Sequence, residues 1–270
     1  MIRSRGYSTS RFTSLQTAYY NKPTALQQAS YDLHLIQLVR SGQVEQFRAI
    51  FNSGISPNPC NAFGESLLHL ICRRGEPESL QVMVDAGCTI QVADDYGRTP
   101  LHDACWAARP CFELVEMILD VDVRFFHMTD CRGALPLSYV RKEHWAAWVE
   151  FLASRKDKYW PKRDIATEGE QEPPELAKLG PNTRPIPDPK DALTVELATM
   201  VATGRIKPDE ARMLLRDNDD TVEASDSDFS DDDSEYDSSD YDSDEESDLD
   251  DEELEEMINT FRLARPAQVQ

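Results

Sequence analysis

The stretch DDYGRTPLHDACWAARP, residues 94–110, decides the fold of this chain. Gly97 favours a tight turn, and Thr99 and Pro100 follow it where a helix begins. A threonine hydroxyl caps the first helical turn, and a proline in the first helical position loses no hydrogen bond there. The stretch therefore predicts a turn followed by a short helix that contains His102.

The same pattern recurs along the chain. Residues 61–90 align with residues 94–123 at a shift of 33 residues. Upstream, Gly42 and Gly54 match Gly75 and Gly87 at the same shift, and downstream Gly133 follows Gly97 at a shift of 36. The chain therefore contains four repeated units, of which the outer two are degenerate, with approximate bounds at residues 30–60, 61–93, 94–129 and 130–158.

A period of 33 residues that carries Gly-x-Thr-Pro-Leu-His resembles the ankyrin repeat. The residues that carry the resemblance are Gly64, Leu68, His69, Gly97, Thr99, Pro100, Leu101, His102 and Gly133. The resemblance implies a β-turn and two antiparallel helices in each unit, stacked into a curved solenoid with a concave binding face. We therefore predict an all-α fold over residues 30–160, a short ankyrin-type solenoid of helix-turn-helix repeats.

The two repeat histidines allow two interpretations. The resemblance implies that His69 and His102 are structural and hydrogen-bond between neighbouring repeats. The alternative is a metal site in which His102 and Cys105 lie one helical turn apart, but zinc needs three or four ligands and no second pair has ligand spacing. Cys72 and Cys105 occupy equivalent small-residue positions, where a buried thiol behaves as a small hydrophobe. We therefore expect no metal, no cofactor and no catalysis.

The resemblance also places a candidate binding face. In solenoids of this type, the turn tips and the exposed side of the first helix line the concave surface. This mapping selects Phe63, Arg73, Arg74, Tyr96, Arg98, Trp106, Arg132 and Lys142 as partner-binding residues. Tyr, Trp and Arg dominate interface hot spots, so we predict an aromatic and basic face that binds a protein. Alternatively, Phe63 and Tyr96 pack on each other and the arginines are merely solvated.

The charge of the chain is concentrated near its end. Residues 217–256 contain 23 Asp and Glu and no Lys or Arg, whereas the remaining residues carry 27 acids and 28 bases. We expect residues 217–253 to be an acidic tail, disordered by charge repulsion. It has six serines with an acid three residues further on, which resemble sites of acidophilic kinases: Ser225, Ser230, Ser234, Ser239, Ser243 and Ser247. Such a tail attracts basic proteins and competes with nucleic acid instead of binding it.

Three further segments complete the organisation. Residues 161–189 are rich in Pro and Glu and are expected to be a linker. Residues 190–216 predict a small helical hairpin that docks either on the repeats or on a partner. Residues 254–265 predict an amphipathic, partner-binding helix, whose spacing also resembles a leucine-rich nuclear export signal: Leu254, Met257, Ile258, Phe261 and Leu263.

The first 29 residues contain four basic residues and no acid. This composition is typical of a disordered basic arm and also resembles a mitochondrial transit peptide, and we favour the arm because its apolar residues form only a weak helical face. No run of about 18 apolar residues is present, so no membrane span is expected. We expect reduced cysteines and a location in the cytoplasm or the nucleus.

Together these features predict a non-enzymatic adaptor that binds a protein partner on the concave face of its repeats. The acidic tail is expected to regulate it, by competing for the same basic face within the molecule. The alternative is an acidic-tail chaperone or nuclear factor, in which the tail binds histones or other basic proteins and the repeats only localise it.

Overall fold

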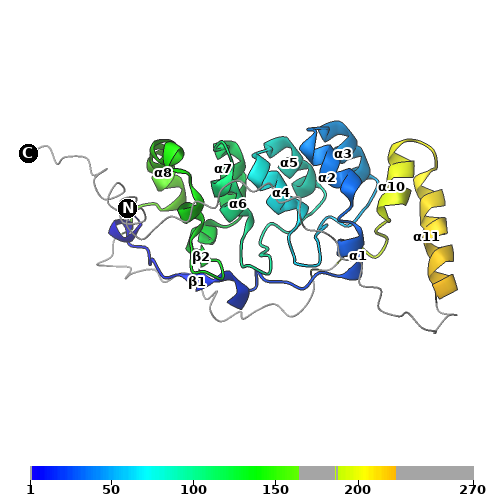
Figure 1. Ribbon diagram of the computed structural model, residues 1–270, viewed down its shortest axis with the longest axis horizontal. Helices are drawn as coiled ribbons and strands as arrows, with labels where there is room; N and C mark the ends of the chain where they lie inside the picture. Colours follow the sequence, from blue (N-terminus) through cyan, green and yellow to red (C-terminus); the bar gives the residue numbers. More distant parts are fainter. Residues whose placement is uncertain (1, 164–185, 187, 223–270) are drawn as a thin grey trace, which may run out of the picture. The chain divides into compact units, whose positions relative to one another are not determined.

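The computed structural model describes residues 2–163, 186 and 188–222, with side chains up to Arg216 (Figure 1). The chain divides into two compact units, residues 1–212 and 213–270, and the first contains the repeats. The candidate phosphorylation serines between 225 and 247 and the amphipathic helix predicted at 254–265 lie outside the described residues. The linker positions 164–185 and 187 lie outside them as well.

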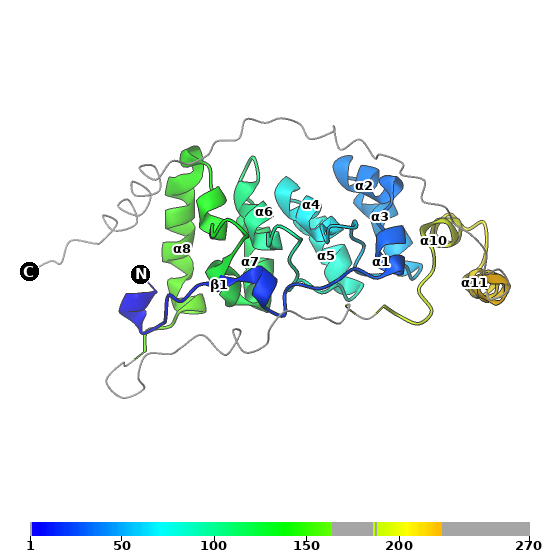
Figure 2. The same ribbon diagram turned by 60° about the horizontal axis from the view of Figure 1, so that its bottom comes forward.

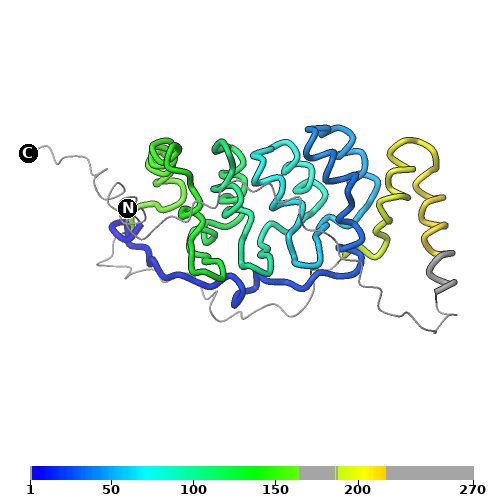
Figure 3. Tube along the Cα trace, viewed as in Figure 1, coloured from blue at the N-terminus to red at the C-terminus, as the bar shows by residue number. Residues whose placement is uncertain are grey.

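Pairs of short helices, stacked in chain order, form the solenoid (Figures 1 and 3). The first three pairs are α2 (Leu33–Arg40) with α3 (Val44–Asn52), α4 (Leu67–Arg74) with α5 (Pro77–Asp85), and α6 (Pro100–Trp106) with α7 (Phe112–Val121). Apolar residues at helical spacing form the core, and the most buried of them include Leu35, Leu67, Ile71, Leu80, Met83, Leu101, Leu114 and Ile118. The structure thus confirms the predicted all-α solenoid.

The fourth unit closes the stack with a modified inner helix. The third unit ends with η3 (Val123–His127), and the helical elements of the fourth are η4 (Pro136–Tyr139), η5 (Lys142–His144) and α8 (Trp145–Tyr159). Leu135 and Ser138 stand where the other repeats have Thr or Ser and His, so the inner segment forms two 3-10 turns instead of an α-helix. Trp148 of α8 is 1% exposed, and Phe151 stacks on Phe112 with ring centroids 4.5 Å apart. The large aromatic side chains of α8 therefore cover the end of the core.

The N-terminal segment is ordered, so our prediction of a disordered arm was wrong. Residues 2–24, which we call the strap, run past the loops that connect the repeats, from the fourth unit to the first (Figure 1, dark blue; Figure 2). The strap contains η1 (Arg3–Arg5), β1 (Phe12–Thr13) and η2 (Ser14–Gln16), and α1 (Ala25–Ala29) follows it. Strand β1 pairs in parallel with β2 (Met128–Thr129) at the end of the third unit. Further along, the Ala93 amide donates to the Tyr19 carbonyl at 2.8 Å.

Tyr19 anchors the strap in the core. Its side chain is 2% exposed, and its ring meets Phe125 edge-on with centroids 5.0 Å apart. The phenol donates to Asp122 Oδ2 at 2.6 Å, and Arg124 donates to the same carboxylate. Burial, followed by the charge of Asp122, raises the pKa of Tyr19, so the phenol remains a hydrogen-bond donor at neutral pH. The basic and Ser/Thr-rich composition of the strap gives no indication of these buried contacts.

Residues after the linker cover the first helix pair. Helix α10 (Val195–Ala202) packs on α3, and the Leu193 amide donates to the Gly54 carbonyl at 2.8 Å. Asp188, expected in a free linker, accepts hydrogen bonds from the hydroxyls of Thr24 (2.5 Å) and Ser56 (2.7 Å). The predicted hairpin therefore docks on the repeats through α10. Its second helix, α11 (Pro208–Val222), extends beyond residue 217, where the tail was predicted to begin.

We predict that replacing Tyr19 with alanine lowers the free energy of unfolding by about 3 kcal/mol, because a buried aromatic ring and its contacts are lost. Tyr19→Phe should cost about 1.5 kcal/mol or slightly more, the contribution of one hydrogen bond to a charged group. Tyr20→Phe is the matched control, because its phenol donates to Asp95, which is exposed. Urea unfolding monitored by circular dichroism measures all three. Equal effects of the two Phe substitutions would contradict the anchoring role of Tyr19.

A second prediction concerns Gly97, whose backbone has φ +78°. A Cβ at this position would lie 2.7 Å from Ser14 Oγ of the strap and 3.1 Å from Asp130 Cα. Gly133 has a similar φ of +82° and no atom within 4 Å of such a Cβ. Both Gly→Ala variants share the backbone strain, so Gly97→Ala should be less stable than Gly133→Ala by a further ~1–3 kcal/mol of overpacking. Similar thermal midpoints for the two variants would argue against close strap packing.

Candidate functional site

Three turns project from the solenoid between successive helix pairs. We call them fingers. The first finger is residues 61–65, the second is residues 94–98, and the third is residues 130–134. In each finger, the first and last residues are joined by a backbone hydrogen bond, for example from the Asp94 amide to the Arg98 carbonyl at 3.0 Å. Each finger also carries a glycine with positive φ, at positions 64, 97 and 133.

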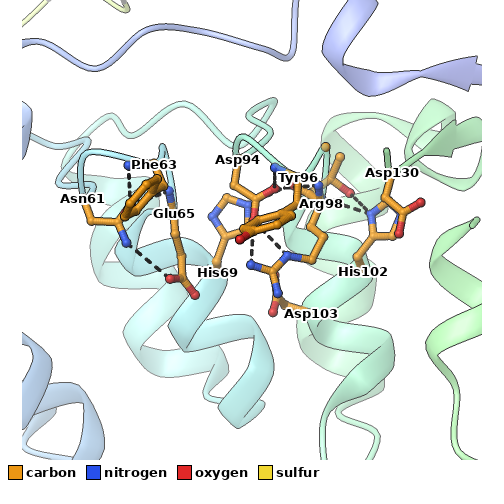
Figure 4. A network of polar contacts seen from close by, with 12 residues as sticks. Asn61, Phe63, Glu65, His69, Asp94, Tyr96, Arg98, His102, Asp103 and Asp130 are labelled. Carbon is orange, nitrogen blue, oxygen red and sulfur yellow. Dashed lines mark hydrogen bonds and ion pairs between the residues drawn. The ribbon is translucent and has the colours of Figure 1, made fainter. Parts of the chain in front are cut away.

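The first residue of each finger fixes its shape. Asp94 Oδ1 accepts from the amides of Tyr96 (3.0 Å) and Arg98 (2.7 Å), as Figure 4 shows. Asn61 and Asp130 make the same pair of contacts in the other two fingers. This side-chain mimicry of a backbone turn is the reason that Asn and Asp favour such positions. We did not identify these three residues from the sequence, although an Asn or Asp three positions before each repeat glycine was the available signal.

The repeat histidines join each helix to the next finger. His102 is fully buried, and its Nδ1 accepts the Thr99 backbone amide at 3.0 Å. Its Nε2 lies 3.3 Å from the Ala134 carbonyl oxygen of the following finger. An amide only donates and a carbonyl only accepts, so these contacts define a neutral ring with the proton on Nε2. Burial lowers the pKa of His102 to about 4, in agreement with that state.

His69 makes the corresponding contacts one repeat earlier. Its Nδ1 accepts the Ser66 amide at 3.1 Å, and its Nε2 lies 3.0 Å from the Arg98 carbonyl oxygen (Figure 4). Both ring nitrogens of both histidines are thus occupied by the protein. In the part of the chain that the structure describes, no group of three or more His, Cys, Asp or Glu side chains is arranged to hold a metal ion.

Two aromatic residues are exposed on neighbouring fingers. Phe63 is 63% exposed and Tyr96 is 57% exposed, so the two rings do not bury each other. The fingers that carry them are linked, because the Asp95 amide donates to the Phe63 carbonyl at 2.9 Å. The third finger is linked in turn by the Cys131 amide, which donates to the Tyr96 carbonyl at 2.8 Å. The fingers therefore form a continuous row with fixed backbone positions.

The arginines beside these rings are neutralised within the protein. Arg73 forms ion pairs with Glu65 and Asp103, both at 2.8 Å. Arg98 pairs with Asp94 at 2.8 Å, and its guanidinium carbon lies 5.2 Å from the centre of the Tyr96 ring. We expected a basic face here, but carboxylates supplied by the same and the following repeat balance the charge. The surface around the first two fingers is therefore aromatic without being strongly basic.

Residues 35–130 match the family model for ankyrin repeats, in three copies. This part of the chain is an ankyrin repeat domain. A curated relative of the ankyrin domain, the potassium channel KOR2 of Oryza sativa subsp. japonica, is 28% identical over 85 residues. The similarity covers 31% of this chain and 12% of that channel, so the chain spans a small part of its relative's length. Ankyrin repeats are generally protein–protein interaction modules, and the family is typically non-catalytic.

The remaining candidate residues lie at different places in the solenoid. Trp106 is half-buried on the inner helix α6, with the Arg73 guanidinium 5.3 Å from its ring centre. Arg132 is exposed on the third finger, and Lys142 is exposed in η5. Arg74 lies apart from the fingers, because it pairs with Glu76 and donates to the Arg40 carbonyl.

Among the described helices, none combines the length and apolar character required to cross a bilayer.

The neutral state of His102 predicts a pH dependence of stability. The unfolded chain binds a proton near pH 6.5 and the folded chain only near pH 4, so acidification within this window favours unfolding. The free energy of unfolding should fall by about 3 kcal/mol as the pH is lowered from the first value to the second. Below the second value, protonation of His102 should cause no further loss of stability. His102→Gln retains a residue suited to capping and does not titrate, so its profile should be flatter.

Thermal unfolding at several pH values measures this effect. His34→Gln is the control, because His34 is exposed at the start of α2. The pKa of His127 is also lowered by burial, but His127 is present in the native chain and in both variants, so it contributes equally to the three pH profiles. If His34→Gln flattened the profile as much as His102→Gln, the assignment to His102 would be wrong.

Proposed function

We propose that this chain is a non-enzymatic adaptor that binds a protein segment across its fingers and the adjoining inner helices. The observation that carries the proposal is the exposure of Phe63 and Tyr96 on neighbouring fingers of the ankyrin domain. Aromatic side chains dominate interface energetics, because each buries a large area at a low entropy cost. Here their backbones are already held by Asn61 and Asp94, so binding orders little additional chain.

The chemistry of the described side chains supports a role without catalysis. Burial raises the pKa of Cys60 and of Cys88 to about 12, and raises those of Cys72 and Cys105 well above their usual value. These thiols are therefore not nucleophiles at neutral pH. The two repeat histidines are hydrogen-bonded at both ring nitrogens, so neither supplies a free acid or base.

We further propose that the acidic segment, residues 217–253, regulates the adaptor and that phosphorylation of its serines increases its charge. The protein is then expected in the cytoplasm or the nucleus. The alternative, an acidic-tail chaperone that binds histones or other basic proteins, is supported by the 23 acids and absence of bases between residues 217 and 256. Affinity for basic proteins that survives loss of the finger aromatics would favour this alternative.

The finger proposal predicts that the double substitution Phe63→Ser and Tyr96→Ser weakens partner binding at least tenfold. The loss of two hot-spot side chains costs at least ~2 kcal/mol of binding free energy. Both side chains are more than half exposed, so stability should hardly change. Val121→Ser is the control, since Val121 is 51% exposed at the end of α7, outside the fingers.

Quantitative affinity purification from cells, with the full chain and both variants as bait, tests this prediction. Proteins retained by the native chain and the Val121 variant but lost by the double variant are the expected partners. An identical set of proteins with all three baits would reject binding through the fingers.

A further inference from the structure

Three arginines of the third and fourth units lack the internal pairing of Arg73 and Arg98. Among the described residues, Arg109, Arg132 and Arg141 form no ion pair with a carboxylate, and Arg109 and Arg132 are exposed. The Nε of Arg141 is buried and has no hydrogen-bond partner. Uncompensated positive charge is therefore present at the fourth unit and the loop beside it, whereas Arg73 and Arg98 are paired.

A chain of contacts brings these arginines to the same part of the domain. Arg132 lies on the third finger, where Asp130 accepts from the Tyr139 phenol at 2.5 Å. The charge of Arg132 acts on Tyr139 and opposes the rise in the pKa of that phenol. Arg141 follows Tyr139 by two residues.

The third arginine reaches this region from the preceding unit. His144 Nε2 lies 2.9 Å from the Ala108 carbonyl oxygen, which sets the loop between α6 and α7 beside η5. Arg109 is the next residue of that loop. Tyr139 also touches the inner helix α6, with its ring 6.5 Å from that of Trp106. The arginines therefore flank a continuous surface from the third finger to the end of α6.

The acids of this region do not neutralise these arginines. Between residues 130 and 144 the acids are Asp130 and Glu143. Asp130 is 2% exposed, with Oδ1 bonded to two backbone amides and Oδ2 to Tyr139. Glu143 is exposed and provides a single negative charge. The exposed guanidinium groups of Arg109 and Arg132 thus have no carboxylate partner among the described residues, and Glu143 is the one exposed acid between residues 130 and 144.

We infer that this surface, which we call the arginine surface, binds a carboxylate-rich segment of a partner protein. Guanidinium groups form bidentate hydrogen bonds with carboxylates, so they select acidic side chains over neutral ones. The surface continues the row of fingers, because the Cys131 amide is bonded to the Tyr96 carbonyl. This inference rests on the proposed function and makes it more specific. Apolar residues of the partner contact Phe63 and Tyr96, and its acidic residues contact Arg132 and Arg109.

A protein segment fits this surface better than a nucleic acid. Proteins that bind duplex DNA through its backbone commonly neutralise about six to ten phosphates. The arginine surface offers the two exposed guanidinium groups of Arg109 and Arg132 and the half-buried one of Arg141, and its neighbouring fingers present aromatic rings beside paired, neutralised arginines. An acidic segment with an apolar part satisfies both features.

Fluorescence anisotropy with a defined probe tests the inference on the full chain. The probe is a labelled synthetic peptide of 16 residues, with a leucine-rich first half and a glutamate-rich second half, and its control has glutamine in place of glutamate. The variant Arg109→Gln with Arg132→Gln removes two charges from the arginine surface. Arg40→Gln with Arg205→Gln is the matched control, because both residues are exposed and lie outside this surface. Arg141 is left intact, since its Nε is buried.

We expect the glutamate peptide to bind at least tenfold more weakly to the Arg109 and Arg132 variant, and within twofold of the native affinity to the control variant. The glutamine peptide should not bind. Equal weakening of both variants would show an effect of net charge alone and would overturn the inference. A labelled duplex DNA that bound more tightly than the peptide, with the same dependence on Arg109 and Arg132, would overturn the choice of a protein partner.

A chain that ends at residue 222 retains every contact described above and is measured in parallel. If neither form binds the peptide, the inference is wrong. If only the shortened form binds, the acidic segment of the chain itself occupies the arginine surface, and the assignment to a partner is wrong. The Phe63→Ser and Tyr96→Ser variant separates the two proposals. Unchanged peptide affinity in that variant would reject the finger proposal while the arginine surface remained supported.

Discussion

A histidine ring that is hydrogen-bonded at both nitrogens joins the second unit to the third and the third unit to the fourth, and the stack depends on this interaction. The ring of His102 accepts the amide that begins its own helix and donates to the finger of the next unit, so one side chain fixes two elements at once. Burial keeps the ring neutral, and only the neutral ring has both an acceptor and a donor. The fourth unit has Ser138 in this position and no further finger to hold. Its inner helix is reduced to 3-10 turns, and the aromatic cap of α8 ends the solenoid.

In a stack of repeats, each repeat contacts only its neighbours, so the first and last units are supported on one side only. The strap changes this, since one continuous segment contacts the fourth unit through Arg5 and Asp157 and the second unit through Tyr19 and Ala93. Helix α10 covers the opposite end, and Asp188 ties the segment before it to Thr24 and Ser56. The first unit and the fourth, which have the most degenerate sequences, therefore receive support from segments outside the repeats.

The features that could be predicted from the sequence are those with local causes. Gly64, Gly97 and Gly133 mark turns because of their own backbone freedom, and the helix start at Thr99 and Pro100 depends on adjacent residues. The strap could not be predicted, because the bond between Tyr19 and Asp122 joins residues 103 positions apart and leaves no periodic signal. The identities of the candidate binding residues were available, but their charge balance was not. Arg73 is neutralised by Asp103, which lies 30 residues away and appears in the sequence as an ordinary helix residue.

The distribution of paired and unpaired arginines distinguishes two parts of the solenoid surface. A guanidinium held by carboxylates, as in Arg73 and Arg98, keeps a fixed position and stiffens the surface beneath the exposed aromatic rings. The binding energy of that region must then come mainly from apolar contact, because its charges are already satisfied. Arg109 and Arg132 have no such partner among the described residues, so an acidic ligand there gains new ion pairs without breaking old ones. A partner that used both regions would be oriented along the fingers by the position of its acids, and this orientation would exclude segments with the reverse order of apolar and acidic residues.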